Sequence, residues 1–416
     1  MLDGVTPVPA EFAARYRERG YWTDQPLFEG FTGALARHAG RTALVDEAGP
    51  VTYRELSDRS AHLARILLDL GFGPLDRIIL QLPNTAMFAY LYFALQRIGA
   101  APVLALPGHR KREITQFAEI SGARALAVPA AVRGFDFTAM AAEVMTSNPA
   151  LRLCFVQGAD GPLPDPRLVR LEDLLEREPR ASAQALAEVS IDPADPALFL
   201  LSGGTTGIPK LIPRTHNDYL YNSKIAAAVC EIGEGDVLLD VLPIEHNLPL
   251  GCPGMQGFLL SGGTVVLGTS TWPRDVFELI QRHRVTHIHL VPALLIRWID
   301  DPAIAEYDLS SLRVIQPALR ADPAGVGRAR LRSVRAGPGL PRQRRTRPGP
   351  LSRGDGGGRA GDRDVAAAHL RAPDQGPREV PRRPDRLRLG LAGRGADGVR
   401  FPQGGAGRAG RQPAGD

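Results

Sequence analysis

The sequence predicts an α/β protein built on parallel, helix-covered sheets. The pattern of apolar residues supports this fold class. Short apolar runs typical of buried strands alternate along the chain with longer stretches whose apolar residues recur near helical spacing. Such alternation is characteristic of strand–helix–strand units, whose strands are buried on both faces. With 416 residues and 44% hydrophobic composition, the chain is long enough for two or three domains and a sizeable core.

The first part of the chain follows this alternation up to residue 156. The predicted helices are 51–67, 87–98 and 113–121, and the predicted strands are 77–82, 102–106, 125–128 and 151–156. Prolines and charges then dominate residues 158–196, which we expect to be a connector with one helix at 171–186. We predict a first α/β subdomain over residues 1–190.

A second α/β run begins with an apolar strand at 197–201. Its other predicted strands are 237–242, 264–267, 287–291 and 312–316, and its predicted helices are 216–230, 276–283 and 292–300. Pro292 stands in the first turn of the last helix, where proline is tolerated. We predict a second α/β subdomain over residues 191–316.

Composition narrows the setting of the protein. The three cysteines, Cys154, Cys230 and Cys252, are odd in number and far apart, which argues against a disulfide framework and against a zinc site. No apolar run is long enough to cross a membrane, and residues 1–14 lack the pattern of a signal peptide. We therefore expect a cytoplasmic protein without a membrane partner.

The loop after the 197–201 strand carries the clearest chemical signal. Glycines let the backbone approach a ligand closely, hydroxyls add hydrogen-bond donors, and a lysine supplies a positive charge, which together suit a polyphosphate. It is not a Walker A loop, because the spacing from glycine to lysine is different and no Ser or Thr follows the lysine. The candidate phosphate-binding residues are Ser202, Gly203, Gly204, Thr205, Thr206, Gly207 and Lys210.

The run 202–210, Ser-Gly-Gly-Thr-Thr-Gly-Ile-Pro-Lys, resembles the phosphate-loop signature of the adenylate-forming superfamily. Within that superfamily the chain is most similar to the stand-alone aryl-acid–AMP ligases of siderophore biosynthesis. Segments 211–219 and 242–254 carry this closer resemblance, while 16–22, 104–110 and 290–292 agree more weakly. The resemblance covers residues 12–316 and implies the N-terminal part of the adenylate-forming enzyme fold.

The resemblance also implies a reaction. Such enzymes join salicylate or 2,3-dihydroxybenzoate to AMP, using ATP and Mg²⁺, and pass the aryl group to the phosphopantetheine thiol of an aryl carrier protein. Positioning and charge stabilisation supply most of the rate in the first step. By the same resemblance His246 and Asn247 border the aryl pocket; a capping or turn role is the alternative for this pair.

Cys252 bears on the choice of acid. The 2,3-dihydroxybenzoate ligases of the family usually carry serine here, and a thiol is a poorer partner for the substrate's 3-hydroxyl. We therefore expect salicylate to be preferred; the alternative is a small buried cysteine with no selective role. His287 and His289 share one face of a strand, but no third ligand is apparent and no metal site is predicted. We expect packing roles for Tyr219 and Tyr221.

The chain departs from the family after residue 316. The aromatic-Gly-x-(Thr or Ala)-Glu motif and the ribose-binding aspartate are missing, and no lysine follows Lys224 to serve as the family's C-terminal catalytic lysine. Residues 317–416 are instead rich in Arg, Gly, Pro and Ala, and we expect them to be disordered. The resemblance thus predicts little or no adenylation activity for the chain as printed.

Three explanations of residues 317–416 remain open. An out-of-frame reading of a GC-rich gene is favoured, because the change falls where the family's fold should continue. An ordinary flexible tail is the second, and a basic nucleic-acid-binding arm is the third. A nucleic-acid partner is disfavoured because Phe401 is the only aromatic residue available to stack on bases.

Two other functions stay open for the chain as a whole. One is an acyl-CoA synthetase-like or amino-acid-activating enzyme, against which the segment 214–219 and the His246–Asn247 pair argue. The other is a non-catalytic remnant that keeps affinity for a nucleotide or an aryl acid.

Overall fold

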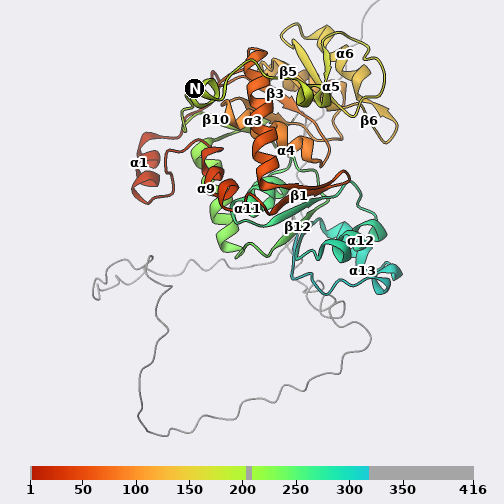
Figure 1. Ribbon diagram of the computed structural model, residues 1–416. Coiled ribbons are helices and arrows are strands. Elements are labelled where there is room, and N and C mark those ends of the chain that lie inside the picture. Colours follow the sequence, from red (N-terminus) through yellow and green to blue (C-terminus); the bar gives the residue numbers. More distant parts are fainter. Residues whose placement is uncertain (1, 203–208, 318–416) are drawn as a thin grey trace, which may run out of the picture. The chain divides into compact units, whose positions relative to one another are not determined.

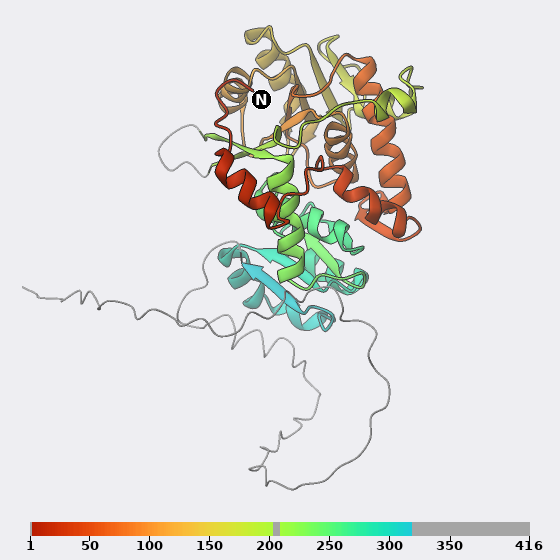
Figure 2. The same cartoon turned by 90° about the vertical axis from the view of Figure 1, so that its left-hand side faces the viewer.

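Two sheets organise the part of the chain that this computed structural model describes, residues 2–202 and 209–317 (Figures 1 and 2). The strands of the first sheet are β3 (Arg77–Leu80), β4 (Ala101–Leu104), β5 (Ala125–Pro129), β8 (Leu153–Gln157), β9 (Leu168–Arg170), β10 (Pro196–Leu201) and β11 (Leu211–Thr215). Their order is β11-β10-β4-β3-β5-β8-β9, and every neighbouring pair is parallel except β10 and β11.

The second sheet contains β1 (Thr42–Asp46), β2 (Gly49–Thr52), β12 (Val237–Asp240), β13 (Thr264–Leu267), β14 (His287–Leu290) and β15 (Val314–Pro317). Their order is β15-β14-β12-β13-β1-β2, parallel apart from the β1–β2 pair. A small antiparallel ribbon pairs β6 (Ala131–Val132) with β7 (Phe135–Asp136). The prediction of parallel, helix-covered sheets is confirmed.

Each sheet takes strands from both sides of residue 190. Strands β1 and β2 lie early in the chain but pair in the six-stranded sheet, whereas β10 and β11 follow residue 190 and pair in the seven-stranded sheet. The division into subdomains 1–190 and 191–316 therefore stays a prediction. It divides the sequence at a point that does not separate the two sheets.

One buried core joins the two sheets. Ile78 and Leu198 of the seven-stranded sheet belong to the same apolar cluster as Leu238 and Val265 of the six-stranded sheet. Helix α4 (Ala86–Arg97) lies within this cluster, with every side chain from 88 to 96 buried, and packs on α3 (Tyr53–Asp69). A helix that is apolar on all sides needs such an enclosed position.

Separate cores lie on the other faces of the sheets. Phe117 of α5 (Lys111–Ser121) and Phe137 of α6 (Phe137–Ser147) are buried against the seven-stranded sheet. Phe277 of α12 (Pro273–His283) and Trp298 of α13 (Pro292–Ile299) are buried with side chains of the six-stranded sheet. Burial on both faces explains why most strands read as continuous apolar runs.

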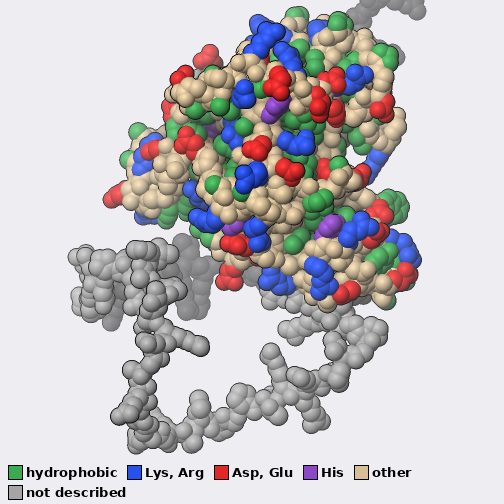
Figure 3. All heavy atoms as spheres, viewed as in Figure 1, with side chains coloured by type: hydrophobic (Ala, Val, Ile, Leu, Met, Phe, Trp, Pro, Cys, Tyr) green, Lys and Arg blue, Asp and Glu red, His purple; other side chains and the backbone are tan. Residues whose placement is uncertain are grey.

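The remaining described helices are α1 (Ala10–Glu18), α2 (Glu29–Arg37), α7 (Leu171–Glu176), α8 (Ala183–Ala187), α9 (His216–Val229), α10 (Asn247–Gly251), α11 (Gly254–Leu260) and the 3₁₀ helix η1 (Pro302–Glu306). Over residues 2–202 and 209–317, no helix has the length and apolarity needed to span a membrane. On the face drawn in Figure 3, basic and acidic side chains are interspersed.

Two predicted helices need correction. The helix predicted at 51–67 begins at Tyr53, because residues 49–52 form β2 and Thr52 caps the helix: its hydroxyl accepts from the Glu55 backbone N–H (3.1 Å), and the Glu55 carboxylate accepts from the Thr52 N–H (2.7 Å). The single helix predicted at 171–186 is wrong. It is broken into α7 and α8, since Arg177 is extended and Pro179 follows.

Several elements were not predicted. They are α1, α2, β1, β2, β6, β7, α6, β9, β11, α10, α11 and η1, which are short, weakly periodic or dependent on distant partners. The predicted disorder of residues 317–416 falls outside the described residues except for Pro317, the last residue of β15.

The start of α9 fastens the N-terminal segment to the fold. His216 is fully buried, and its Nδ1 accepts a hydrogen bond from the Leu27 backbone N–H at 3.1 Å. Next to it, the Asn217 side-chain amide exchanges two 2.9 Å bonds with Asp24, accepting from the backbone N–H and donating to the carboxylate. Because Nδ1 must accept, the ring has to stay neutral there, and burial lowers the pKa of His216 to about 4.

This histidine predicts acid sensitivity. An unfolded histidine takes up a proton near pH 6.5 whereas the folded His216 does not, so stability is lost as the pH falls from about 6.5 toward 4. We expect His216→Asn, whose amide oxygen can still accept from Leu27, to remove about 2–3 kcal/mol of the difference in unfolding free energy between pH 7 and pH 4.5. Urea denaturation at both pH values measures it. His62→Asn is the control, and an equal effect of both substitutions would contradict the assignment.

Candidate functional site

The two ends of the glycine-rich loop are held together. The Ser202 backbone N–H donates to the Lys210 carbonyl at 3.0 Å, and the Lys210 N–H donates to the Ser202 hydroxyl oxygen at 2.9 Å. Antiparallel β10 and β11, which pair Leu201 with Leu211, form the base of the loop. Of the predicted loop residues, Gly203, Gly204, Thr205, Thr206 and Gly207 lie outside the described part. Ser202 and Lys210, the two described ends of the loop, are thus held next to each other.

A cavity of about 400 Å³ opens beside this base. Its walls come from the segments that follow β4, β10 and β12, together with part of β11. The lining residues are Leu104, Leu106, His109, Leu200, Leu201, Ser202, Pro209, Ile212, Arg214, Glu245, His246 and Asn247. Three residues predicted from the sequence, Ser202, His246 and Asn247, therefore share one cavity. Neither Lys210, which is exposed, nor Cys252 lines it.

Two buried amides position the cavity walls. The Asn84 side chain donates to the carbonyls of Asp240 (2.9 Å) and Leu242 (2.8 Å) and accepts from the Ile244 N–H (3.0 Å). The Gln81 amide donates to the Leu106 carbonyl at 2.7 Å and to the His109 carbonyl at 3.0 Å. Both amides follow β3, so one short segment fixes the loops that carry His109 and His246.

Asn247 is oriented by its neighbours. The Tyr219 hydroxyl donates to Asn247 Oδ1 at 3.1 Å, and Asn247 Nδ2 donates to Cys252 Sγ at 3.2 Å. Asn222 Nδ2 donates to the same sulfur at 3.3 Å. Burial raises the pKa of Tyr219, which keeps its hydroxyl protonated as the donor. Within residues 2–202 and 209–317, the second N–H of the Asn247 amide has no partner and can donate to a ligand.

This network refines two interpretations. Tyr219 packs in the core as predicted, but it also holds Asn247, a role that sequence spacing does not reveal. Tyr221 stacks on Tyr21 with ring centroids 4.8 Å apart, which fits the predicted packing role. His246 stands at the N-cap of α10 without a side-chain capping hydrogen bond among the described residues, so capping does not account for it.

Two imidazoles line the cavity as neutral groups. Burial lowers the pKa of His246, and burial together with His246 lowers that of His109, although Glu113 opposes the second shift. His109 Nδ1 accepts from the Leu106 backbone N–H at 3.0 Å. His109 was part of a weakly matching segment and was not singled out as a site residue. His109 already uses Nδ1 as an acceptor, so its neutral ring can only donate to a ligand, through Nε2–H, whereas a neutral His246 can donate or accept.

Glu245 is the most unusual lining residue. Its side chain is 2% exposed, and neither carboxyl oxygen has a hydrogen-bond partner among the described residues. Burial, with a smaller effect of the nearby Asp240 carboxyl, raises its pKa well above the ordinary value. No sequence signal distinguishes this glutamate from a surface residue, since a charged residue after a strand is usually exposed.

The two histidines of β14 lie near two carboxylates, Asp240 at the end of β12 and Asp236 just before its first residue. His289 Nδ1 lies 3.8 Å from Asp240 Oδ1, and His287 Nδ1 lies 3.6 Å from Asp236 Oδ1. His287 also shares a 2.8 Å hydrogen bond with the Thr286 hydroxyl. Among residues 2–202 and 209–317, no three His, Cys, Asp or Glu side chains are grouped so as to hold a metal ion.

Comparison with known proteins matches these features to one family. The AMP-binding enzyme family matches residues 31–336. Triostin synthetase I of Streptomyces triostinicus is 44% identical over 329 residues, covering 79% of this chain and 59% of the relative. The salicyl-AMP ligase / salicyl-S-ArCP synthetase of Mycobacterium tuberculosis is 42% identical over 320 residues, covering 76% of this chain and 55% of the relative.

Two further comparisons agree. The 2,3-dihydroxybenzoate-AMP ligase of Bacillus subtilis is 42% identical over 317 residues, covering 76% of this chain and 56% of the relative. The apo structure of MbtA from Mycobacterium smegmatis superposes with a TM-score of 0.71 at 39% identity, covering 80% of this chain and 59% of that one. The chain thus spans somewhat more than half the length of these relatives.

The buried glutamate yields a prediction. Between the ordinary glutamate pKa and the raised value of Glu245, the folded chain holds a proton that the unfolded chain has lost, so stability falls as the pH rises, by up to about 1.4 kcal/mol per pH unit. We expect Glu245→Gln, which does not titrate, to gain unfolding free energy relative to the parent chain from pH 5 to pH 8. Denaturation at the two pH values tests this. The exposed Glu176→Gln is the control, and a pH-independent difference for Glu245→Gln would refute the assignment.

Proposed function

The chain belongs to the AMP-binding enzyme family, and from that premise we propose that it derives from an aryl-acid–AMP ligase that binds salicylate or 2,3-dihydroxybenzoate. One observation carries the proposal. The base of the phosphate loop at Ser202 and the pair His246–Asn247 line the same cavity, so a polyphosphate and an aromatic carboxylate would meet there. The names of two relatives, a salicyl-AMP ligase and a 2,3-dihydroxybenzoate-AMP ligase, support this substrate class.

We expect the loop to hold the phosphates of a nucleotide. The hydrogen bonds between Ser202 and Lys210 hold the two ends of a segment whose glycines and hydroxyls suit phosphate binding. ATP would supply the adenylyl group, with pyrophosphate as the leaving group; in this chain Lys210 would provide positive charge, and the Ser202 O–H could donate to a phosphate oxygen. Mg²⁺ would accompany the nucleotide, but the described residues form no site for it, and we derive no step from it.

The aromatic acid would lie against His246 and Asn247. Because Tyr219 and Cys252 occupy Oδ1 and one N–H of the Asn247 amide, the free N–H can donate to a carboxylate or to the ortho oxygen of the ring. An amide fixed before the ligand arrives binds it with a smaller entropy cost than a mobile one. These contacts would orient the carboxylate toward the phosphate loop, which is the main contribution that adenylation needs.

Salicylate is the acid we favour. Cys252 does not line the cavity, but its sulfur accepts from the amide of Asn247, which does, and from that of Asn222. We expect a 3-hydroxyl beside Asn247 to reach this sulfur, and a thiol is a weak partner for it. Transfer of the aryl group to the thiol of a carrier protein, in siderophore biosynthesis in the cytoplasm, completes the proposal. A non-catalytic protein that keeps aryl-acid affinity is the second candidate, because the sequence holds no lysine after Lys224.

Aryl-acid binding tests the proposal without requiring turnover. We expect the full chain to bind salicylate in calorimetric titration, and Asn247→Ala to weaken binding at least tenfold, since a hydrogen bond to a charged group contributes about 1.5–3 kcal/mol. Tyr219→Phe should weaken it less, because the amide persists but is no longer fixed. The exposed Gln184→Ala is the control. Unchanged affinity in Asn247→Ala would show that the acid binds elsewhere or not at all.

The preference between acids gives a second prediction. We expect Cys252→Ser to shift the affinity ratio toward 2,3-dihydroxybenzoate over salicylate by about three- to tenfold, because a hydroxyl pairs better than a thiol with the 3-hydroxyl, by about 1 kcal/mol. Titration of both acids into both proteins measures the ratio. Cys230→Ser, at the end of α9, is the matched control. An unaltered ratio in Cys252→Ser would remove the basis for favouring salicylate.

A further inference from the structure

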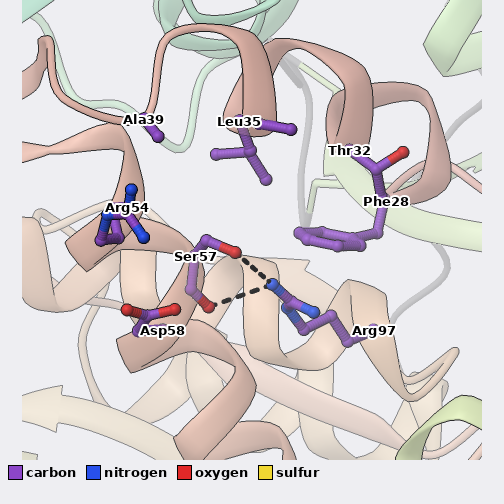
Figure 4. A pocket seen from close by; sticks show the side chains of 9 residues that line it. Phe28, Thr32, Leu35, Ala39, Arg54, Ser57, Asp58 and Arg97 are labelled. Carbon is purple, nitrogen blue, oxygen red and sulfur yellow. Dashed lines mark hydrogen bonds between the residues drawn. The ribbon is translucent and has the colours of Figure 1, made fainter.

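A second pocket lies apart from the cavity just described and shares no lining residue with it. It measures about 260 Å³ and lies between α2, α3 and the last residue of α4 (Figure 4). One wall, from α2 and its flanks, is mainly apolar, while α3 and α4 supply the charged groups. The lining residues are Phe28, Thr32, Leu35, Ala36, Ala39, Arg54, Ser57, Asp58 and Arg97.

Arg97 supplies a positive charge to the wall of this pocket. Its guanidinium carbon lies 3.8 Å from the centroid of the Phe28 ring. Its Nε donates to the Ser60 hydroxyl at 3.2 Å, and one terminal nitrogen donates to the Ser57 carbonyl and hydroxyl oxygens, each at 3.0 Å (Figure 4). These contacts fix the plane of the guanidinium, but all of them are to neutral groups.

The charge of Arg97 is therefore only partly compensated. Burial lowers its pKa to about 10, and the attraction of Asp58 opposes this shift. Asp58 also shares the pocket with Arg54, which lies four residues before it on α3. Two arginines and one carboxylate leave an excess of one positive charge on the pocket wall. A partly buried cation without a full counter-charge favours an anion from solution.

We propose that this pocket binds a small oxyanion, a carboxylate or phosphate that carries a short apolar group. The oxyanion would pair with Arg97 and Arg54, since guanidinium groups match carboxylate and phosphate oxygens in geometry. The apolar group would lie on Phe28, Leu35 and Ala39. The volume is below the usual range for drug-sized ligands, which limits the ligand to a few carbon atoms.

Butyrate and monobutyl phosphate are the probes, titrated calorimetrically into the full chain at constant ionic strength, with butanol as the uncharged analogue. We expect saturable binding of at least one of the two anions and none of butanol. Butyrate alone would identify a carboxylate site, and monobutyl phosphate alone would identify a phosphate site. Equal binding of butanol, or binding of neither anion, would overturn the proposal.

Substitutions locate the binding. We expect Arg97→Gln to weaken it at least tenfold and the exposed Arg54→Gln about threefold, while Asp58→Asn, which removes the competing carboxylate, should tighten it about threefold. Arg112→Gln, an exposed arginine on α5, should have no effect. If Arg97→Gln does not fold, the other two variants still test the proposal, because binding should weaken in Arg54→Gln and tighten in Asp58→Asn. A purely structural role for these residues does not predict tighter binding in Asp58→Asn.

The phosphate loop is the competing site for the same probes. Lys210→Gln should leave binding unchanged if the anion lies at Arg97. Binding that is lost in Lys210→Gln and retained in Arg54→Gln and Asp58→Asn would assign the anion to the loop instead and overturn the proposal.

Discussion

The hydrogen bonds of the Asn84 side-chain amide connect the two sheets and position the site. It is 6% exposed, follows β3 of the seven-stranded sheet, and bonds to backbone groups of three residues at and beyond the end of β12 in the six-stranded sheet. Those backbone groups are buried and would otherwise lack partners at considerable cost. The same bonds hold the segment that carries Glu245, His246 and Asn247. The contacts that join the two sheets therefore also fix the wall of the cavity.

The position of the cavity follows from strand direction. In parallel sheets the carboxyl ends of the strands meet at one edge, and ligands bind in the crevice outside it. Here His109 follows β4, Ser202 follows β10 and His246 follows β12, so residues that are more than a hundred positions apart line one cavity. The buried core around α4 holds both edges in place. The proposed phosphate loop and the proposed acid pocket thus lie together because their segments leave the same ends of parallel strands.

The sequence predicted what depends on local pattern. Apolar strands, the long helices and the glycine-rich loop with its following motifs were identifiable because each is encoded within a few consecutive residues. Strand partners were not: β1 pairs with β2 at one edge and with the distant strand β13 at the other, which no periodicity reveals. The failed helix at 171–186 shows one proline outweighing helical composition. Glu245 and Asn84 escaped notice because an isolated polar residue after a strand is usually a surface residue, and Tyr219 was expected only to pack.

The polar side chains near the cavity differ in how well their hydrogen-bonding groups are satisfied. Tyr219, Asn247 and Cys252 satisfy one another, so they cost little when the cavity is empty and are already aligned for a ligand. Glu245 and Asp240 are buried, and none of their carboxyl oxygens has a hydrogen-bond partner among the described residues. Folding raises the pKa of both, which opposes stability at neutral pH. A fold tolerates such a cost where a bound ligand or proton offsets it. Glu245 is the one of these two carboxyls that lines the cavity, so a ligand bound there could change its pairing.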